Sequence, residues 1–130
     1  MATEFKSQIC TTREQSERLL ALGLKKETAD MRRPHYNEHT PWVIDERDCL
    51  NEHWLPAWSL HRLIEMMSDF CDVDGEEGVW CCESRVILGY RSVMTEDWLI
   101  MWNKPSLYDN IIDCIEWQIK EGYFNKEYLA

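Results

Sequence analysis

A proline and a serine three residues apart determine where a helix can begin in the middle of this 130-residue chain. Pro56 crowds the residue before it and so disfavours helix at Leu55. Ser59 is then the predicted N-cap, with Trp58 and Leu63 spaced to pack against each other across the first turn. The helix that follows has one apolar face, made by Leu60, Leu63, Ile64 and Met67. The segment therefore predicts a helix from Ser59 to about Met67, anchored by a buried Trp58.

Two further helices are predicted from the residues at their ends. The first begins at Thr11 or Thr12 and ends before Gly23, which adopts the left-handed C′ conformation at little cost. The last begins at Ser106 and ends before Gly122. Its apolar stripe is wide and consists of Tyr108, Ile111, Ile112, Ile115 and Ile119. Each of these helices therefore has a face to bury.

The sequence period changes from helical to extended over residues 79–104. A first strand is predicted over 79–90. With Ser84 tolerated between them, Trp80, Cys82, Val86, Leu88 and Tyr90 share one face of this strand, and Glu83, Arg85 and Arg91 share the other. A second strand, Trp98–Trp102, is apolar on both faces, which favours a central or doubly covered position in the sheet. Thr95–Asp97 supplies the hairpin turn between the two strands.

The remaining segments are less regular. Asp69–Gly78 is predicted to be an acidic turn, and the apolar tail Phe124–Ala130 is expected to dock on the sheet. Residues 25–52 show only a weak pattern, within which Trp42–Ile44 favours a brief strand. The sequence predicts one α+β domain over residues 1–130, with about three helices packed on a small antiparallel sheet.

The composition is that of a folded acidic domain. Hydrophobic residues make up 45% of the chain and aromatic residues 12%, too many for a disordered acidic chain. The net charge is −10, and residues 66–130 carry 13 acidic against 5 basic side chains. Because such a surface repels a phosphate backbone, direct nucleic-acid binding is not expected.

The sequence also favours a location away from membranes. Its start has no basic segment followed by an apolar one, and no apolar run is long enough for a membrane helix. A cytoplasmic location is therefore expected, and in that compartment thiols stay reduced. We predict free thiols at all six cysteines: Cys10, Cys49, Cys71, Cys81, Cys82 and Cys114.

The four histidines are candidate metal ligands. His35 and His39 lie four residues apart, as two zinc ligands on a helix would. The prolines on either side disfavour a helix, and the HExxH order is absent. His53 and His61 could complete a site only through tertiary contact. Surface histidines are the preferred interpretation.

Two other patterns suggest chemistry but lack its requirements. Cys81 and Cys82 are adjacent instead of forming CxxC, and no base or cation is spaced to activate them. Asp72–Glu77 is similar to a calcium loop, but its glycine comes too early and Glu83, at the closing position, follows an apolar strand pattern. No P-loop, GxGxxG or GxSxG is present. We therefore assign no catalytic, cofactor-binding or metal-binding residue, and expect no cofactor.

Three patches together resemble a group of small uncharacterised proteins carried by bacterial phages and other mobile elements of gut bacteria. They are Glu27–Met31, the Pro-Ala-Trp-Ser-Leu patch at Pro56–Leu60, and the closing helix Asp109–Gly122. The Pro-Ala-Trp-Ser-Leu patch is the most specific of them. The resemblance implies a bacterial cytoplasmic setting and a prophage origin. Because the group has no established activity, it assigns no functional residue.

Three functional hypotheses follow. The first is a non-enzymatic protein-interaction or structural accessory protein that self-associates, since seven Trp and five Tyr are typical of interfaces. The second is an acidic inhibitor or nucleic-acid mimic that binds a basic host protein through Asp109, Asp113 and Glu116. For those three carboxylates a solvated helix face is the preferred interpretation. The third and least favoured is a metal-dependent or cysteine enzyme using His35, His39, His53 or Cys81.

Overall fold

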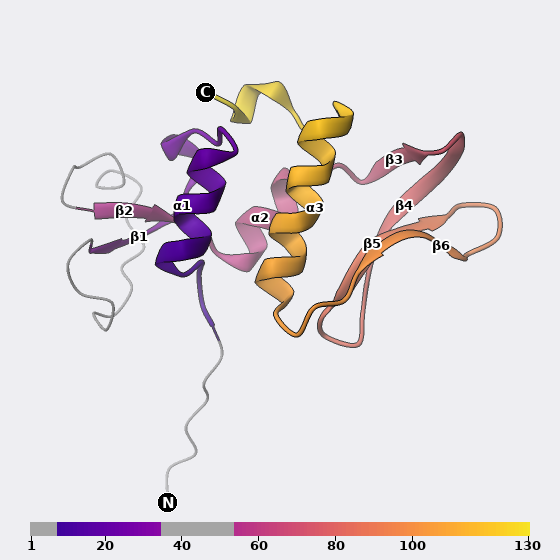
Figure 1. Ribbon diagram of the computed structural model, residues 1–130, viewed down its shortest axis with the longest axis horizontal. Coiled ribbons are helices and arrows are strands. Elements are labelled where there is room, and N and C mark those ends of the chain that lie inside the picture. The colour runs from indigo at the N-terminus through magenta and orange to yellow at the C-terminus, as the bar shows by residue number, and fades with distance from the viewer. Residues whose placement is uncertain (1–7, 35–53) are drawn as a thin grey trace, which may run out of the picture.

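The computed structural model describes residues 8–34 and 54–130, which form three α-helices and two antiparallel sheets (Figure 1). The helices are α1 (Arg13–Ala21), α2 (Leu60–Met66) and α3 (Leu107–Glu121). The small sheet pairs β1 (Met31–Pro34) with β2 (Trp54–Ala57). The larger sheet contains β3 (Phe70–Val73), β4 (Glu76–Glu83), β5 (Ile87–Ser92) and β6 (Trp98–Trp102), in that order. The predicted α+β class is confirmed, and the strand suggested at Trp42–Ile44 lies outside the described residues.

Helix α1 has the predicted signals at both ends. The Thr12 hydroxyl accepts a hydrogen bond from the Gln15 backbone N–H, and the Gln15 side chain accepts one from the Thr12 N–H. Gly23 follows the helix with a φ of 104°. Leu24 then folds back so that its N–H donates to the Leu19 carbonyl, and both leucines are buried. The helix thus stops where glycine permits a left-handed backbone.

Helix α2 begins at the predicted cap. The Ser59 hydroxyl accepts from the first turn, while Asp30 accepts from both the Ser59 N–H and its hydroxyl. Trp58 and Leu63 are fully buried, as the spacing of this pair predicted. The Trp58 indole N–H donates to Thr28 at 2.9 Å, so the tryptophan is fixed by a polar contact as well as by packing.

The residues immediately before α2 form strand β2, a feature that the sequence pattern did not reveal. Pro56 stands opposite Arg32 in the β1–β2 ladder. The Arg32 guanidinium lies over the Trp54 ring, 4.1 Å from its centroid. Pro56 thus lies within β2, which continues to Ala57, and the helix begins only after Ser59.

The larger sheet departs from the prediction in its turns. The single strand predicted over 79–90 is wrong, because β4 and β5 form a hairpin that reverses through Ser84 and Arg85. Both residues have positive φ, 54° and 71°. Hairpin positions with this conformation are usually occupied by Asn or Gly. Because this turn contains neither Asn nor Gly, the sequence does not mark it as a turn. The alternation of apolar and polar side chains therefore predicts one uninterrupted strand.

Two further predictions about this sheet are wrong. Asp69–Gly78 is not one acidic turn, because it contains β3 and the start of β4, and the reversal is confined to Asp74 and Gly75. Trp98–Trp102 does form a strand, β6, but that strand lies at the edge of the sheet and not at its centre. The predicted turn at Thr95–Asp97 lies between β5 and β6.

Helix α3 packs against one face of this sheet. The helix contributes Ile111, Ile112 and Ile115 to the core, all fully buried, together with Leu88 and Tyr90 of β5. The predicted cap at Ser106 and the left-handed Gly122 are confirmed. Figure 1 shows the hairpin tips of the sheet extending beyond the helices.

The prediction that the C-terminal tail docks on the sheet is wrong. The tail lies beside the end of α1. Leu129 forms a β-bridge with Leu24, and the Ala130 N–H donates to the Gly23 carbonyl at 2.7 Å. The partner is a backbone edge left open by the loop after α1, so the tail satisfies polar groups as well as burying Phe124. Among the described residues no helix combines the length and apolarity needed to cross a membrane.

Candidate interaction surface

The two faces of the larger sheet have different surroundings. The face toward α3 carries Leu88 and Tyr90, both fully buried, and Trp102, whose ring lies 5.7 Å from that of Trp117. Successive side chains of a strand point to opposite faces, so the ladder register defines the residues of the other side. We call that other side the outer face.

Two adjacent rows of the outer face are mainly apolar, and the acidic residues Asp72, Glu77 and Glu83 border them on the same face. One row of directly paired residues crosses all four strands and consists of Phe70, Val79, Arg91 and Trp98. The adjacent row consists of Cys81, Gly89 and Met101. Phe70 is 57% exposed and Met101 41%, unusual values for large apolar side chains in a sheet. The outer face therefore presents contiguous hydrophobic surface to its surroundings.

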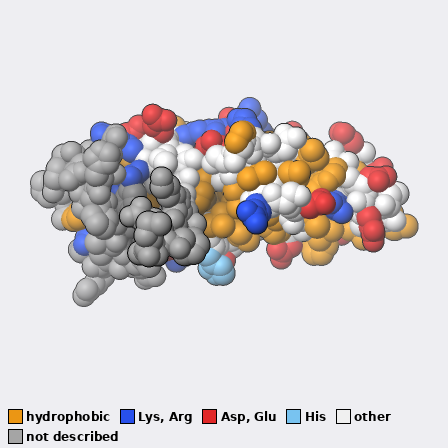
Figure 2. Space-filling model, turned by 90° about the horizontal axis from the view of Figure 1, so that it is seen from below, with side chains coloured by type: hydrophobic (Ala, Val, Ile, Leu, Met, Phe, Trp, Pro, Cys, Tyr) orange, Lys and Arg blue, Asp and Glu red, His pale blue; other side chains and the backbone are white. Residues whose placement is uncertain are grey.

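The end of the molecule that carries the larger sheet holds most of the exposed large hydrophobic side chains. The exposed large hydrophobic side chains of the described residues are Ile9, Phe70, Val93, Met94 and Met101, and all but Ile9 belong to the sheet or its β5–β6 turn. Figure 2 shows hydrophobic side chains gathered over the half of the molecule that carries the sheet, with acidic ones at its far end. A shallow hollow of about 480 Å³ lies on this side, lined by Phe70, Val79, Cys81, Arg91, Ser92, Val93 and Glu96.

The one cation in the outer-face row is neutralised within the chain. The Arg91 guanidinium lies over the Trp98 ring, 4.4 Å from its centroid, and forms an ion pair with Glu83. Stacking flattens the arginine against the sheet. The row can therefore contact an apolar partner without burying an unpaired charge.

Gly89 lets β6 approach β5 closely in the middle of this face. A Cβ at position 89 would lie 2.1 Å from the Ile100 carbonyl oxygen and 2.8 Å from the Met101 Cα. These contacts are with backbone, which does not move aside as a flexible side chain would. Any larger residue would push β6 away and disrupt the surface.

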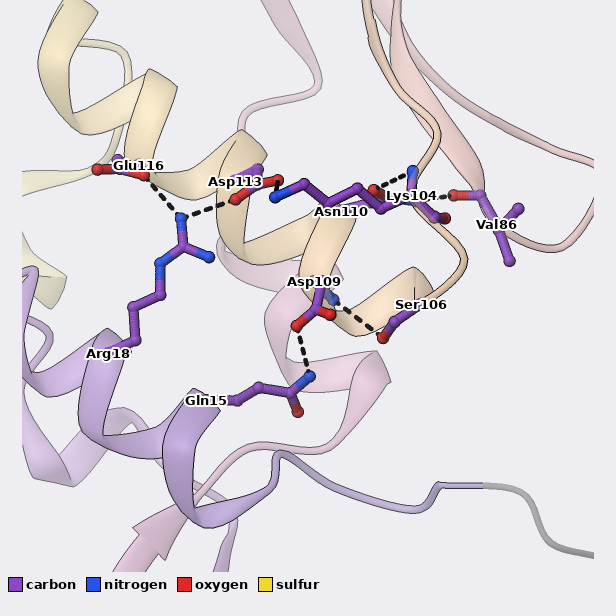
Figure 3. Close-up of polar contacts among 9 residues, drawn as sticks. All are labelled: Gln15, Arg18, Val86, Lys104, Ser106, Asp109, Asn110, Asp113 and Glu116. Carbon is purple, nitrogen blue, oxygen red and sulfur yellow. Dashed lines mark hydrogen bonds and ion pairs between the residues drawn. The ribbon is translucent and has the colours of Figure 1, made fainter.

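The carboxylates of α3 are engaged within the chain (Figure 3). Arg18 of α1 donates to Asp113 and to Glu116, each at 2.7 Å. Lys104 reaches the second oxygen of Asp113 at 2.8 Å. Burial acts to raise the pKa of the Asp113 carboxyl, but the hydrogen bonds from Lys104 and Arg18 outweigh burial and hold it below its usual value.

Asp109 completes this seam between α1 and α3 by accepting from the Gln15 side-chain amide at 2.8 Å. The preferred expectation for Asp109, Asp113 and Glu116 was a solvated helix face. The structure instead places all three against α1. They hold two helices together, so they do not form an open acidic surface.

The candidate metal ligands do not assemble in the described part of the chain. His61 lies on the exposed side of α2, with its Nε2 2.8 Å from Glu65. His35, His39 and His53 lie outside the described residues. Within residues 8–34 and 54–130 no group of three His, Cys, Asp or Glu side chains could hold a metal ion.

The cysteines of the described residues are all free: Cys10, Cys71, Cys81, Cys82 and Cys114. Cys81 and Cys82 point to opposite faces of β4, with Cys81 half-buried on the outer face and Cys82 exposed although it shares a face with Trp80. Burial, followed by the neighbouring Cys81, raises the pKa of the Cys82 thiol. Burial also raises the pKa of Cys114 to about 12. Raised pKa values disfavour the thiolate that cysteine chemistry needs.

The acidic segment before β4 is a hairpin turn and not an ion-binding loop. The Asp72 side chain accepts from the Gly75 N–H at 2.8 Å, which closes the turn between β3 and β4. Glu83, the residue at the closing position of a calcium loop, lies at the other end of β4. The strand thus keeps the two acidic groups apart.

Sequence reasoning missed Phe70 and Met101 as surface residues. The sequence predicts an acidic turn around Phe70, and it predicts a central or doubly covered strand around Met101. The available signal was the alternation of Phe70 and Asp72 with Cys71 and Val73, which is too short to identify a strand.

Comparison of the chain with protein-family models, curated proteins and solved structures found no match.

Proposed function

We propose that the protein is a non-enzymatic interaction protein that binds protein surfaces, a second copy of itself included, through its larger sheet. The observation that carries the proposal is the mainly apolar row across the outer face, from Phe70 to Trp98, in which Arg91 is paired with Glu83 and Met101 is exposed alongside. Burying an exposed aromatic or methionine side chain contributes roughly 1.5–3 kcal/mol. A few such residues are enough to act as anchors of a protein interface.

The setting of this function rests on the three patches that resemble phage and mobile-element proteins. We include a bacterial, cytoplasmic setting and a prophage origin in the proposal. Ala57 and Trp58, from the most specific patch, are buried. That patch therefore supports the fold, and the proposed binding surface lies elsewhere in the chain.

The test compares two lysine substitutions at similarly exposed hydrophobic residues. Phe70→Lys changes the outer face, whereas Ile9→Lys changes a side chain that is 52% exposed and lies far from the sheet in sequence. The full chain and both variants are compared for partner proteins captured from a bacterial lysate. We expect Phe70→Lys to abolish the capture of a partner that Ile9→Lys retains. A chain that neither captures a partner nor self-associates, or a captured partner unaffected by Phe70→Lys, would contradict the proposal.

A second candidate is the acidic inhibitor of a basic host protein. The α3 carboxylates do not support it, because Arg18, Lys104 and Gln15 already engage them. The exposed acidic residues at the hairpin tips do favour it: Asp74, Glu76, Glu77, Glu96 and Asp97. Reversing the charge of the Glu76–Glu77 pair would abolish binding to a basic partner, whereas capture unaffected by that reversal would eliminate this candidate.

A further inference from the structure

Strand β6 is an apolar edge. It is the last strand in the order of the larger sheet. Its edge away from β5 therefore pairs with no other strand of the described chain. All five of its residues are large and hydrophobic, and none is buried. An edge strand presents a row of backbone N–H and C=O groups that can pair with another strand. Natural proteins usually protect such edges with charges, and β6 itself contains none.

The opposite edge of the same sheet provides the contrast. β3 has only four residues and contains Asp72, with Asp69 and Asp74 on either side. Short length and charge are the usual protection of an edge strand. The two edges of the sheet thus differ in length and charge. β3 is protected against pairing with another strand, and β6 is open to it.

The charges around β6 indicate what pairs with it. Glu96 and Asp97 precede the strand and Lys104 follows it closely, and all three side chains are exposed. When two copies of β6 lie antiparallel about a two-fold axis near Ile100, the acidic start of each strand lies beside the Lys104 end of the other. Parallel pairing would instead bring like charges together. The strand is therefore complementary to itself in the antiparallel direction only.

A hollow beside this edge would receive side chains of the added strand. It has a volume of about 210 Å³ and is lined by Trp102, Asp113, Glu116, Trp117 and Lys120. Trp102 belongs to β6 and the other residues to α3. A strand that continues the sheet past β6 would lie over this hollow and cover the half-buried Trp102 and Trp117 rings.

We propose that β6 pairs antiparallel with β6 of a second copy, joining the two larger sheets into one continuous sheet. This inference rests on the proposed protein-binding function and specifies a second copy as one partner and the edge as its site. The joined sheet leaves the outer faces of both copies open. Self-association would therefore present a binding surface of twice the area.

The test uses charge exchange at the two ends of the strand. Lys104→Glu and Glu96→Lys each place like charges together twice in a symmetric dimer, and each should weaken dimerisation on the order of tenfold by sedimentation equilibrium. The double variant restores the attraction and should recover the dimer. Because Lys104 also contacts Asp113, circular dichroism and thermal melting verify that each variant is folded.

A second measurement separates edge pairing from stacking of the outer faces. Hydrogen exchange at the β6 backbone amides should slow as protein concentration rises, while the β3 amides stay unchanged. Phe70→Lys should leave the dimer intact. A chain that is monomeric at every concentration overturns the inference, as does a dimer lost in Phe70→Lys or not restored by the charge exchange. A monomer whose captured partner still depends on Phe70 would overturn edge pairing and leave the protein-binding function standing.

Discussion

Asn110 connects α3 to the larger sheet, and replacing it tests whether that junction holds the sheet in place. Its side chain is fully buried. The amide N–H groups donate to the Val86 carbonyl at 2.6 Å and to the Lys104 carbonyl at 2.9 Å, and the amide oxygen accepts from the Lys104 N–H at 2.8 Å (Figure 3). Asn110→Leu keeps the volume and removes all three bonds.

The expected loss follows from these three contacts. Each broken bond at a buried site costs roughly 1–1.5 kcal/mol, so we expect Asn110→Leu to lower the free energy of unfolding by about 3–5 kcal/mol. Urea unfolding followed by tryptophan fluorescence measures it, and an unchanged slope shows that the unfolded state is comparable. Asn103→Leu, at an exposed asparagine two residues after Met101, should change stability by less than about 0.5 kcal/mol. If Asn110→Leu lowers the free energy of unfolding by less than about 1 kcal/mol, the three hydrogen bonds of Asn110 do not hold the sheet in place.

Three further outcomes are expected. Trp58→Ala should lower the free energy of unfolding by about 3–5 kcal/mol, because the ring is fully buried, and an unchanged melting temperature would contradict this. Stability should fall as the pH drops through the lowered pKa of Asp113, because protonation releases its contacts with Arg18 and Lys104. Asp113→Asn should lack this part of the pH dependence in urea unfolding, and parallel curves would disprove the assignment. Gly89→Ala should speed hydrogen exchange at the β6 amides, since its Cβ overlaps the Ile100 carbonyl; unchanged exchange would count against the close approach.

The helices could be predicted because their signals are local. Thr12, Ser59 and Ser106 cap their helices through their own side chains, and Gly23 and Gly122 end two of them through their own backbone conformation. The capping contacts themselves are made by neighbouring residues, although Asp30 also holds Ser59. The sequence alone therefore specified where the helices begin and end.

The sheet was harder to predict because its turns and pairing are not local. Ser84 and Arg85 form a reversal with positive φ without the usual Asn or Gly, so the sequence predicts one strand where the structure has two. The apolar pattern of β6 indicated coverage on both faces. That pattern does not distinguish coverage by the same chain from coverage by another.

The candidate surface depends on register and could not be predicted from composition. Phe70, Val79, Arg91 and Trp98 form one row only because four strands align in a particular way. A shift of one residue in any strand would move its side chains to the other face. The acidic residues of α3 illustrate the same limit, since only the packing of α1 shows that Arg18 engages Asp113 and Glu116.

The most direct test of the proposed binding function is oxidative footprinting of the full chain, in cells and as dilute purified protein. Phe70 and Met101 are readily oxidised side chains on the outer face, and Met94, 89% exposed in the β5–β6 turn, is an internal control. A bound partner should protect Phe70 and Met101 in cells while Met94 stays as reactive as in the purified chain. Equal reactivity of Phe70 and Met101 in both settings would contradict the proposal that this sheet binds protein.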